Sequence, residues 1–482
     1  MKAVAIFTLG AMLTSSAFGA ANIVIINGDN AGEGFNDPTP INPIGGNTGT
    51  TLGQQRLKVF QQAAAIFGAT LTSSVTIEVR ATFDAQPCTA TAAVLGSAGA
   101  QRIFSDPSGT ILSPANHWFN EAITNKITGV NNSANNMPED ADIRAVFNSN
   151  LGSNGGAGNP GCGFSFYLGL DNNAPLGQTS LLPVVLHELA HGLGFQTFTN
   201  ASTGAQLLGA PSKFDSMLRD NTSGLLWNQM NDAQRAASAR NARNLVWTGA
   251  SVASAISSVL NLGTPQLQVT APATLIGDYR ASALQGATLA YPNLTLAGVL
   301  GEVMPALDAV AGGTLTDACE PLTPAGALGV NGKIALIDRG FCTFNLKITN
   351  VTAAGAIGAI IVDNVAGSPP TLTGPSVGPA IPALMISQAD GAALRDFLRF
   401  RSRTRSGLFA RVGLNSNFSG ADSAGRAIMF APDPFIAGSS VSHWDPIMFR
   451  NQLMEPSFSP GLTLSVNVPE DLTFAQLLDM GW

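Results

Sequence analysis

The feature that most constrains the fold of this chain is a strongly apolar segment, TSLLPVVLHELAHGLGF at 179–195, that carries three ionisable side chains. Its length and composition indicate a buried helix, with Pro183 in the first turn, where proline is tolerated. His187, Glu188 and His191 interrupt the apolar stretch. Burying polar groups costs free energy unless they find partners. We therefore expect these three side chains to share a partner inside the protein.

The spacing of the two histidines indicates what that partner is. Residues four apart on a helix lie on one face with ~5–6 Å between their Cβ atoms. His187 and His191 can therefore both reach one tetrahedral zinc ion at ~2.0–2.1 Å. Glu188, beside the first of them, can take a proton from zinc-bound water as that water attacks a peptide carbonyl. A structural pair of core histidines beside a buried glutamate is the alternative, and it leaves all three groups in need of other partners.

A catalytic zinc ion usually has three protein ligands and one open position, so a third ligand is needed. Gly194 fits the pattern H-E-x-x-H-x-x-G-x-x-H, but the position of its last histidine holds Thr197, a weak ligand. Asp215 offers a carboxylate, although a surface or helix-start aspartate is the simpler interpretation. Only two further histidines exist, His117 and His443. His117, in SPANHWFN, has no metal-like companions.

Three motifs together resemble the leishmanolysin-type metzincins. They are HELAHGLGF, then SHWD far downstream, then NQLMEP. In that family a long insertion separates the helix from the third histidine, and a methionine turn lies beneath the metal. The resemblance implies one catalytic zinc ion, with His187, His191 and His443 as ligands, Glu188 as the base and Met454 as the turn methionine. Taken alone, Met454 would be an ordinary core methionine.

The order of secondary structure indicates an α+β catalytic domain. Residues 53–67 carry apolar side chains at helical spacing, and 74–83 alternates like a half-buried strand. We expect further strands at 22–28, 141–148 and 163–170. A helix, several strands and a second helix favour an α+β fold. With the resemblance, this implies a zincin or metzincin-like domain made of a twisted sheet and the active-site helix.

The composition shifts after about residue 260, toward short strands rich in Val, Ile and Leu. Within this region, CEPL and then GKIALIDRGFCTFNLKITNVTAAGAIGAIIVDN resemble a protease-associated (PA) domain. Such domains are accessory modules of several protease families and carry no catalytic residues. We expect an α/β PA domain at 268–412, inserted between the catalytic segments 20–267 and 413–482. It could cover the cleft, bind substrate or fill a loop.

Four cysteines are present, and an even number in an exported protein suggests disulfides. Three pairings are possible. Proximity within the expected domains favours Cys88–Cys162 and Cys319–Cys342, and the second pair occupies the cysteine positions of the PA resemblance. Alternatively, Cys162 could cap the zinc ion as a latency thiolate.

The N-terminus is typical of a secretory signal at 1–19. Lys2 supplies the positive charge, an apolar run follows, and small residues place cleavage near Gly19 to Ala21. A membrane anchor is the alternative, but the run is too short to span a bilayer. We therefore expect a secreted protein without a membrane span in the mature chain.

The composition narrows the function further. The chain has 482 residues, 45% of them hydrophobic, and a formal net charge of -7. The basic cluster RFRSRTR at 399–405 stands alone, which makes nucleic acid a poor partner. The sequence predicts a secreted zinc endopeptidase acting on proteins or peptides. The alternative is a secreted binding or adhesion protein with a vestigial zinc site, which would not need Glu188 as a base. No feature indicates the oligomeric state.

Overall fold

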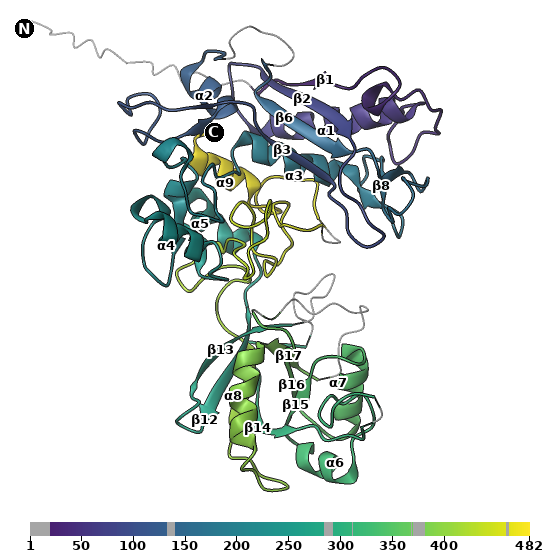
Figure 1. Ribbon diagram of the computed structural model, residues 1–482, viewed down its shortest axis with the longest axis vertical. Coiled ribbons are helices and arrows are strands. Elements are labelled where there is room, and N and C mark those ends of the chain that lie inside the picture. Colours follow the sequence, from purple (N-terminus) through teal and green to yellow (C-terminus); the bar gives the residue numbers. More distant parts are fainter. Residues whose placement is uncertain are drawn as a thin grey trace, which may run out of the picture.

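The computed structural model describes residues 20–132, 140–283, 293–310, 312–367, 369, 381–458 and 462–482. Figure 1 shows an upper part, built from both ends of the chain, and a lower part, built from its middle. We call them the α+β part (20–264 and 415–482) and the barrel (265–414). The expected signal at 1–19 lies outside the described residues. Within those residues, no helix has both the length and the apolar character needed to cross a membrane.

A four-stranded sheet in the order β1-β2-β6-β3 organises the α+β part. Its strands are β1 (Ile23–Asn27), β2 (Ile77–Asp84), β6 (Ile143–Asn148) and β3 (Gly96–Ala100). The first three run parallel, and β3 runs antiparallel to β6 at one edge. Helices α1 (Leu52–Thr70) and α3 (Leu181–Leu193) contact each other, and α3 lies along β3. The edge strand and the histidine-bearing helix are therefore neighbours.

Aromatic packing fixes α1 against this sheet. Phe60 of α1 meets Phe147 of β6 with ring centroids 4.7 Å apart, and Phe35 meets Phe60 at 4.9 Å, both edge to face. Such pairs contribute about 0.5–1.5 kcal/mol beyond the area that they bury. The side chain of Thr51 caps the start of α1 by accepting from the N–H of Gln54.

The C-terminal segment belongs to the same core as the N-terminal one. A single cluster of buried hydrophobic residues draws on residues 21–260 and again on 421–482. Helix α9 (Thr473–Met480) packs on α5 (Ala250–Val259), and Phe195 meets Trp444 edge to face at 4.9 Å. The two ends of the chain therefore build one folded unit.

Shorter elements complete the α+β part. They are β4 (Ile103–Phe104), β5 (Phe119–Asn120), α2 (Glu121–Thr128), β7 (Gly152–Ser153), β8 (Ser165–Tyr167), β9 (Thr179–Ser180), β10 (Leu218–Asp220), α4 (Asp232–Ser238) and β11 (Leu245–Trp247), with short 3-10 turns at Gly34–Asn36, Leu207–Gly209, Asp215–Met217 and Trp227–Gln229.

The lower part is a closed barrel in the order β12-β13-β17-β16-β15-β14-β18. Its strands are β12 (Pro265–Ala271), β13 (Gly277–Ser282), β14 (Val299–Pro305), β15 (Ile334–Asp338), β16 (Gly358–Val362), β17 (Ala383–Ile386) and β18 (Phe409–Leu414), and its helices are α6 (Pro324–Val330), α7 (Phe344–Ala353) and α8 (Gln388–Leu398). Strands β16 and β17 are buried throughout. Two hydrophobic clusters made largely of barrel residues give this part its own core.

Both expected disulfides are present. Cys88 is bonded to Cys162 with Cα atoms 5.2 Å apart, and Cys319 to Cys342 with Cα atoms 5.7 Å apart. The first joins two loops of the α+β part, and the second lies in the barrel. Since the sulfur of Cys162 is in a disulfide, it has no thiolate to offer a metal.

One expected strand is much shorter than its sequence pattern. The strand expected at 163–170 is only β8, Ser165–Tyr167. The flanking N–H groups bond to loops instead: Gly163 to the Thr89 carbonyl, Leu168 to the Asn154 side chain and Leu170 to the Gly45 carbonyl. The apolar pattern extends beyond the strand because loops, and not neighbouring strands, cover Leu168, which is buried, and Leu170, which is half-buried.

Candidate metal centre

Helix α3 brings the first two histidines together, and the backbone conformation at its C-terminal end requires a glycine. Nε2 of His187 lies 3.1 Å from Nε2 of His191. The chain leaves the helix at Gly194 with φ of 140°, where an added Cβ would lie 2.8 Å from Cδ1 of Ile123. Only glycine fits such a backbone and such a close approach.

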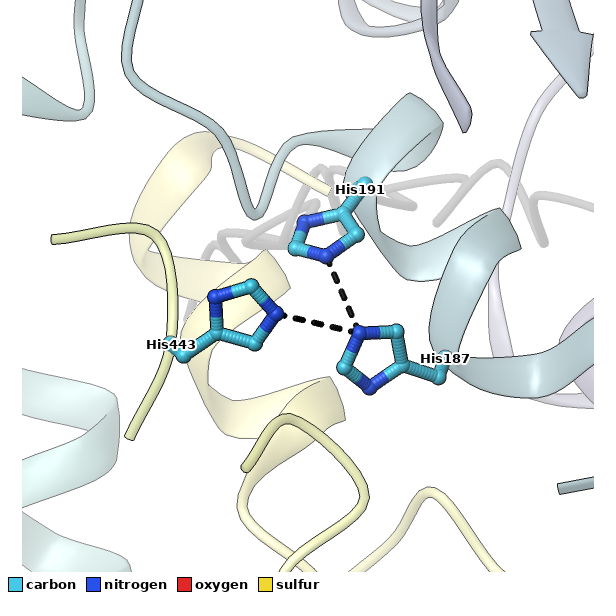
Figure 2. Close-up of side chains that lie close together, drawn as sticks. All are labelled: His187, His191 and His443. Carbon is cyan, nitrogen blue, oxygen red and sulfur yellow. Dashed lines mark hydrogen bonds between the residues drawn. The ribbon is translucent and has the colours of Figure 1, made fainter. Parts of the chain in front are cut away.

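The third histidine joins them from the far end of the chain. Nε2 of His443 lies 3.2 Å from Nε2 of His187, although 256 positions separate the two residues. Figure 2 shows one nitrogen of each imidazole directed toward a shared centre. Two nitrogens bound to a tetrahedral zinc ion at ~2.0–2.1 Å are about 3.3 Å apart. The observed separations therefore match those of zinc ligands.

Hydrogen bonds to backbone carbonyls set the tautomer of each ring. The Nδ1 atoms contact the carbonyl oxygens of Leu453 (from His187, 2.6 Å), Phe195 (from His191, 2.7 Å) and Ser439 (from His443, 2.7 Å). A carbonyl can only accept, so Nδ1 carries the proton and Nε2 keeps its lone pair. Three lone pairs that face one another suit a cation between them, and this donor set fits zinc.

Burial keeps the three rings neutral. It lowers the pKa of His187, lowers that of His191 to about 3, and lowers that of His443 well below its usual value. Neighbouring histidines add to the lowering at His191 and His443. Neutral imidazole is the form that binds metals, so the rings are ready as ligands at neutral pH.

Glu188 lies beside the histidines but faces the edge strand. It is 7% exposed, and burial raises its pKa to about 8, while the N–H of Ala98 on β3 donates to the carboxylate and opposes the rise. A Cβ added at Gly96 would lie 3.3 Å from Cγ of Glu188. The carboxylate thus occupies the gap between α3 and β3, outside the group of three histidines.

The segment that contains Met454 adjoins the same centre. Met454 is fully buried, and its carbonyl accepts from the N–H of Trp444, the residue after His443. The preceding residue, Leu453, supplies the carbonyl that orients His187. The expected turn is therefore next to two of the three histidines.

The other ligand candidates have different partners. Asp215 is fully buried, and its two oxygens accept from the hydroxyls of Thr197 at 2.6 Å and Thr199 at 2.8 Å, and from the N–H of Ser212 at 2.7 Å. Asp215 does not belong to the histidine group, and the hydroxyl of Thr197 donates to Asp215. The Nδ1 atom of His117 contacts the Ala115 carbonyl, and this ring also lies outside the group.

Sequence reasoning missed the residues that hold the ligands in place. The orienting carbonyls have no sequence signature, because every residue carries one. Asp471 accepts from the N–H of Leu453, yet in the sequence it is only an aspartate shortly before a helix. Gln196 accepts from the outward N–H of Ala100 on β3 at 3.4 Å, and its only signal is its place just after Gly194.

Comparison with known proteins identifies the central part of the barrel segment. Residues 301–394 match the PA domain family. This region is a PA domain. The matched region runs from β14 to α8 of the barrel and includes the Cys319–Cys342 disulfide. The PA domain that the resemblance implied is therefore confirmed, while its exact boundaries and the metzincin character of the α+β part stay predictions.

Individual relatives are similar over short stretches. The receptor homology region, transmembrane domain- and RING domain-containing protein 1 of Oryza sativa is 43% identical over 82 residues, 17% of this chain and 15% of that protein. Leucine aminopeptidase 2 of Arthroderma otae is 46% identical over 66 residues, 14% of this chain and 13% of that protein. C5a peptidase of Streptococcus pyogenes is 48% identical over 68 residues, 14% of this chain and 6% of that protein. The chain thus spans a small fraction of each relative, two of which are peptidases.

Solved structures give weaker likenesses. BSAP, a zinc aminopeptidase from Bacillus subtilis, is 25% identical over 34% of this chain and 36% of its own, with a TM-score of 0.21. An aminopeptidase from Aneurinibacillus is 22% identical over 33% of this chain and 32% of its own, with a TM-score of 0.22. Scores this low do not relate the α+β part to either enzyme, so its chemistry has to be argued from its own site.

Proposed function

We propose that this protein is a zinc-dependent endopeptidase. One observation carries the proposal: Nε2 of His443 lies 3.2 Å from that of His187 across 256 positions of sequence. A chance meeting of core histidines would not direct three proton-free nitrogens at one point, because such an arrangement is stabilised only by a cation. A zinc ion held there would supply a Lewis acid that lowers the pKa of a bound water to about 7.

The protein's own residues supply the remaining chemistry. Glu188 is adjacent to a ligand without being one. Burial raises its pKa, and the positive charge of a bound zinc ion would lower it again. The carboxylate could then accept a proton from water and return it to the leaving amine. Its present partner is the N–H of Ala98 on the edge strand. This contact puts the proposed base next to β3, the strand along which we propose that the peptide binds.

The edge strand favours cleavage within a chain. β3 is hydrogen-bonded to β6 on one side only, and α3 lies along it. An extended peptide can add to such an edge as a further strand once it replaces Glu188 and Gln196 as the acceptors of the N–H groups of Ala98 and Ala100. Because a strand pairs along its whole length, it can hold residues on both sides of the scissile bond, which is what an endopeptidase requires.

Export is part of the proposal. Two disulfides agree with an oxidising compartment, in keeping with the signal expected at 1–19. N-terminal sequencing of protein recovered from the culture medium would locate the cleavage expected near Gly19 to Ala21.

The test uses peptides with both ends blocked. We expect purified mature protein to contain about one zinc ion per chain by analogy with three-ligand catalytic sites, and to cleave casein and end-blocked quenched peptides in a chelator-sensitive way. An exopeptidase would need a free end and would leave such peptides intact. His117→Gln is the matched control, since His117 is the one histidine outside the cluster, and this variant should keep both zinc and activity. Bound zinc without any peptide hydrolysis would instead favour a binding protein with a vestigial site.

A further inference from the structure

The three histidines differ in what orients them. His191 and His443 each contact a carbonyl four residues away, so local backbone sets those rings. His187 contacts the carbonyl of Leu453, 266 positions away. The orientation of His187 therefore depends on how firmly the turn at Leu453 is held.

A buried carboxylate holds that turn. Oδ2 of Asp471 accepts from the N–H of Leu453 at 2.7 Å, and Oδ1 accepts from the N–H of Thr473 at 2.7 Å. Asp471 is fully buried, and no ion pair involving it is found among the described residues. Both backbone groups of Leu453 are thus committed, the N–H to Asp471 and the carbonyl to His187.

A second link joins the same two segments. Oε1 of the fully buried Gln452 accepts from the N–H of Leu472 at 2.8 Å. The turn also reaches the third histidine, because the carbonyl of Met454 accepts from the N–H of Trp444 at 2.8 Å. A shift of the turn would therefore move the carbonyl that His187 contacts, and it would also disturb Trp444, the residue after His443.

We propose that Asp471 is a positioning residue of the metal centre, which holds the Leu453–Met454 turn so that His187 presents Nε2 to the metal. This inference rests on the proposed function, since it assumes that the three histidines bind zinc. Partners that orient metal-bound histidines usually change metal affinity by ~10–100-fold when they are removed. Asp471 acts one step further out, through the backbone of Leu453.

Helix α9 extends this support to the end of α3. Nε1 of Trp482 donates to the carbonyl of Leu193 at 2.7 Å, and Nε2 of Gln476 donates to the carbonyl of Gly194 at 3.4 Å. Figure 1 shows α9 beside α3. The segment from Asp471 to the C-terminus thus contacts the turn at one end and the exit of the histidine-bearing helix at the other.

The same segment provides a matched control. Asp479 also accepts backbone N–H groups, from Ser251 at 2.8 Å and Val252 at 3.2 Å, and the indole N–H of Trp247 at 2.9 Å. These contacts fasten α9 to α5 and do not involve the turn. Asp479→Asn therefore removes a carboxylate anchor from the same C-terminal segment without touching the contacts of His187.

The experiment compares Asp471→Asn with Asp479→Asn in the full mature chain. Zinc affinity is measured by competition with a chromophoric chelator, the ligand field by the visible spectrum of the cobalt-loaded protein, and stability by thermal unfolding of the metal-free protein. We expect Asp471→Asn to weaken zinc binding by about tenfold or more and to alter the cobalt bands. Asp479→Asn should lower the melting temperature while leaving zinc affinity and the cobalt spectrum as in the unmodified protein.

The outcomes of this experiment support or overturn the positioning role of Asp471. Unchanged zinc affinity and cobalt bands in Asp471→Asn overturn the inference, as does an equal loss of affinity in both variants. If Asp471→Asn does not fold, Gln452→Met removes the second link without a change of charge, and unchanged zinc affinity there also overturns it. Absence of zinc binding by the unmodified protein would contradict the proposed function itself, which separates the two failures.

Discussion

Pro265 and Leu414 are direct partners in the antiparallel ladder between β12 and β18. The first and last residues of the barrel are therefore neighbours. The insertion of its roughly 150 residues keeps the chain segments before and after it close together. This explains how His443 can reach a site begun on α3. Domain termini often lie close together, which is why insertions of whole domains are tolerated.

The same pairing predicts that residues 265–414 fold when expressed alone. Their strands close on themselves, with two largely self-contained hydrophobic clusters and the Cys319–Cys342 disulfide across 23 positions. We expect a cooperative melt by circular dichroism, and a loss of about 3 kcal/mol of unfolding free energy on reduction, as is typical for a loop of this size. A protease-labile product without a cooperative transition would show that the unit depends on the α+β part.

A pH effect on stability is expected at Asp142, which precedes β6. It is 2% exposed, and burial, with added repulsion from Glu121 and Glu78, raises its pKa to about 6 from 3.8. The fold therefore favours the protonated carboxyl. That contribution is fully present below about pH 4 and is lost as the pH rises through about 6.

Asp142→Asn cannot ionise, so it should escape this loss. Relative to the unmodified protein, the variant should gain up to about 3 kcal/mol between pH 4 and pH 7.5, from about two pKa units at 1.36 kcal/mol each. Denaturant unfolding of both metal-free proteins at the two pH values measures this. An equal difference at both pH values would mean that Asp142 ionises normally in the fold.

The sequence predicted the features that depend on residues close together in the chain. His187, Glu188 and His191 could be placed because four-residue spacing on a helix fixes which side chains meet. The helix itself, α3, was expected at nearly its observed bounds because every apolar residue in it is buried. The strand at 163–170 was overestimated because burial by loops and burial by sheet neighbours leave the same apolar pattern.

Long-range contacts were beyond that reasoning. His443 could be proposed only by resemblance, since nothing near it in the sequence marks a ligand. The roles of Leu453 and Asp471 depend on a backbone carbonyl and a backbone N–H brought together by folding. Closure of the barrel depends on β18 pairing with both β12 and β14, which side-chain periodicity does not encode.

Glu188→Gln should separate metal binding from catalysis. The variant keeps the size of the side chain and lies outside the histidine group, so zinc content should be unchanged. Loss of the general base should lower kcat by ~10²–10⁴-fold. Zinc analysis and turnover of an end-blocked peptide by the same preparation test this. Near-native turnover by the zinc-loaded variant would show that another group takes the proton.

The last prediction concerns the third ligand. His443→Ala removes a nitrogen that faces the shared centre, so zinc should be lost together with activity, and the effect should exceed the ~10–100-fold typical of supporting residues. Asp215→Ala and Thr197→Ala should keep zinc, because the Asp215 carboxylate is satisfied by neighbouring hydroxyls and an N–H and lies outside the histidine group.

Asp215→Ala should still be costly, since it leaves those buried donors without an acceptor, at about 1–3 kcal/mol for each group. Its signature is therefore a lower melting temperature at full zinc content, whereas the signature of His443→Ala is the loss of zinc. Metal analysis and calorimetry on the two variants distinguish these patterns. Stoichiometric zinc in His443→Ala together with its loss in Asp215→Ala would reverse the assignment and make the C-terminal segment purely structural.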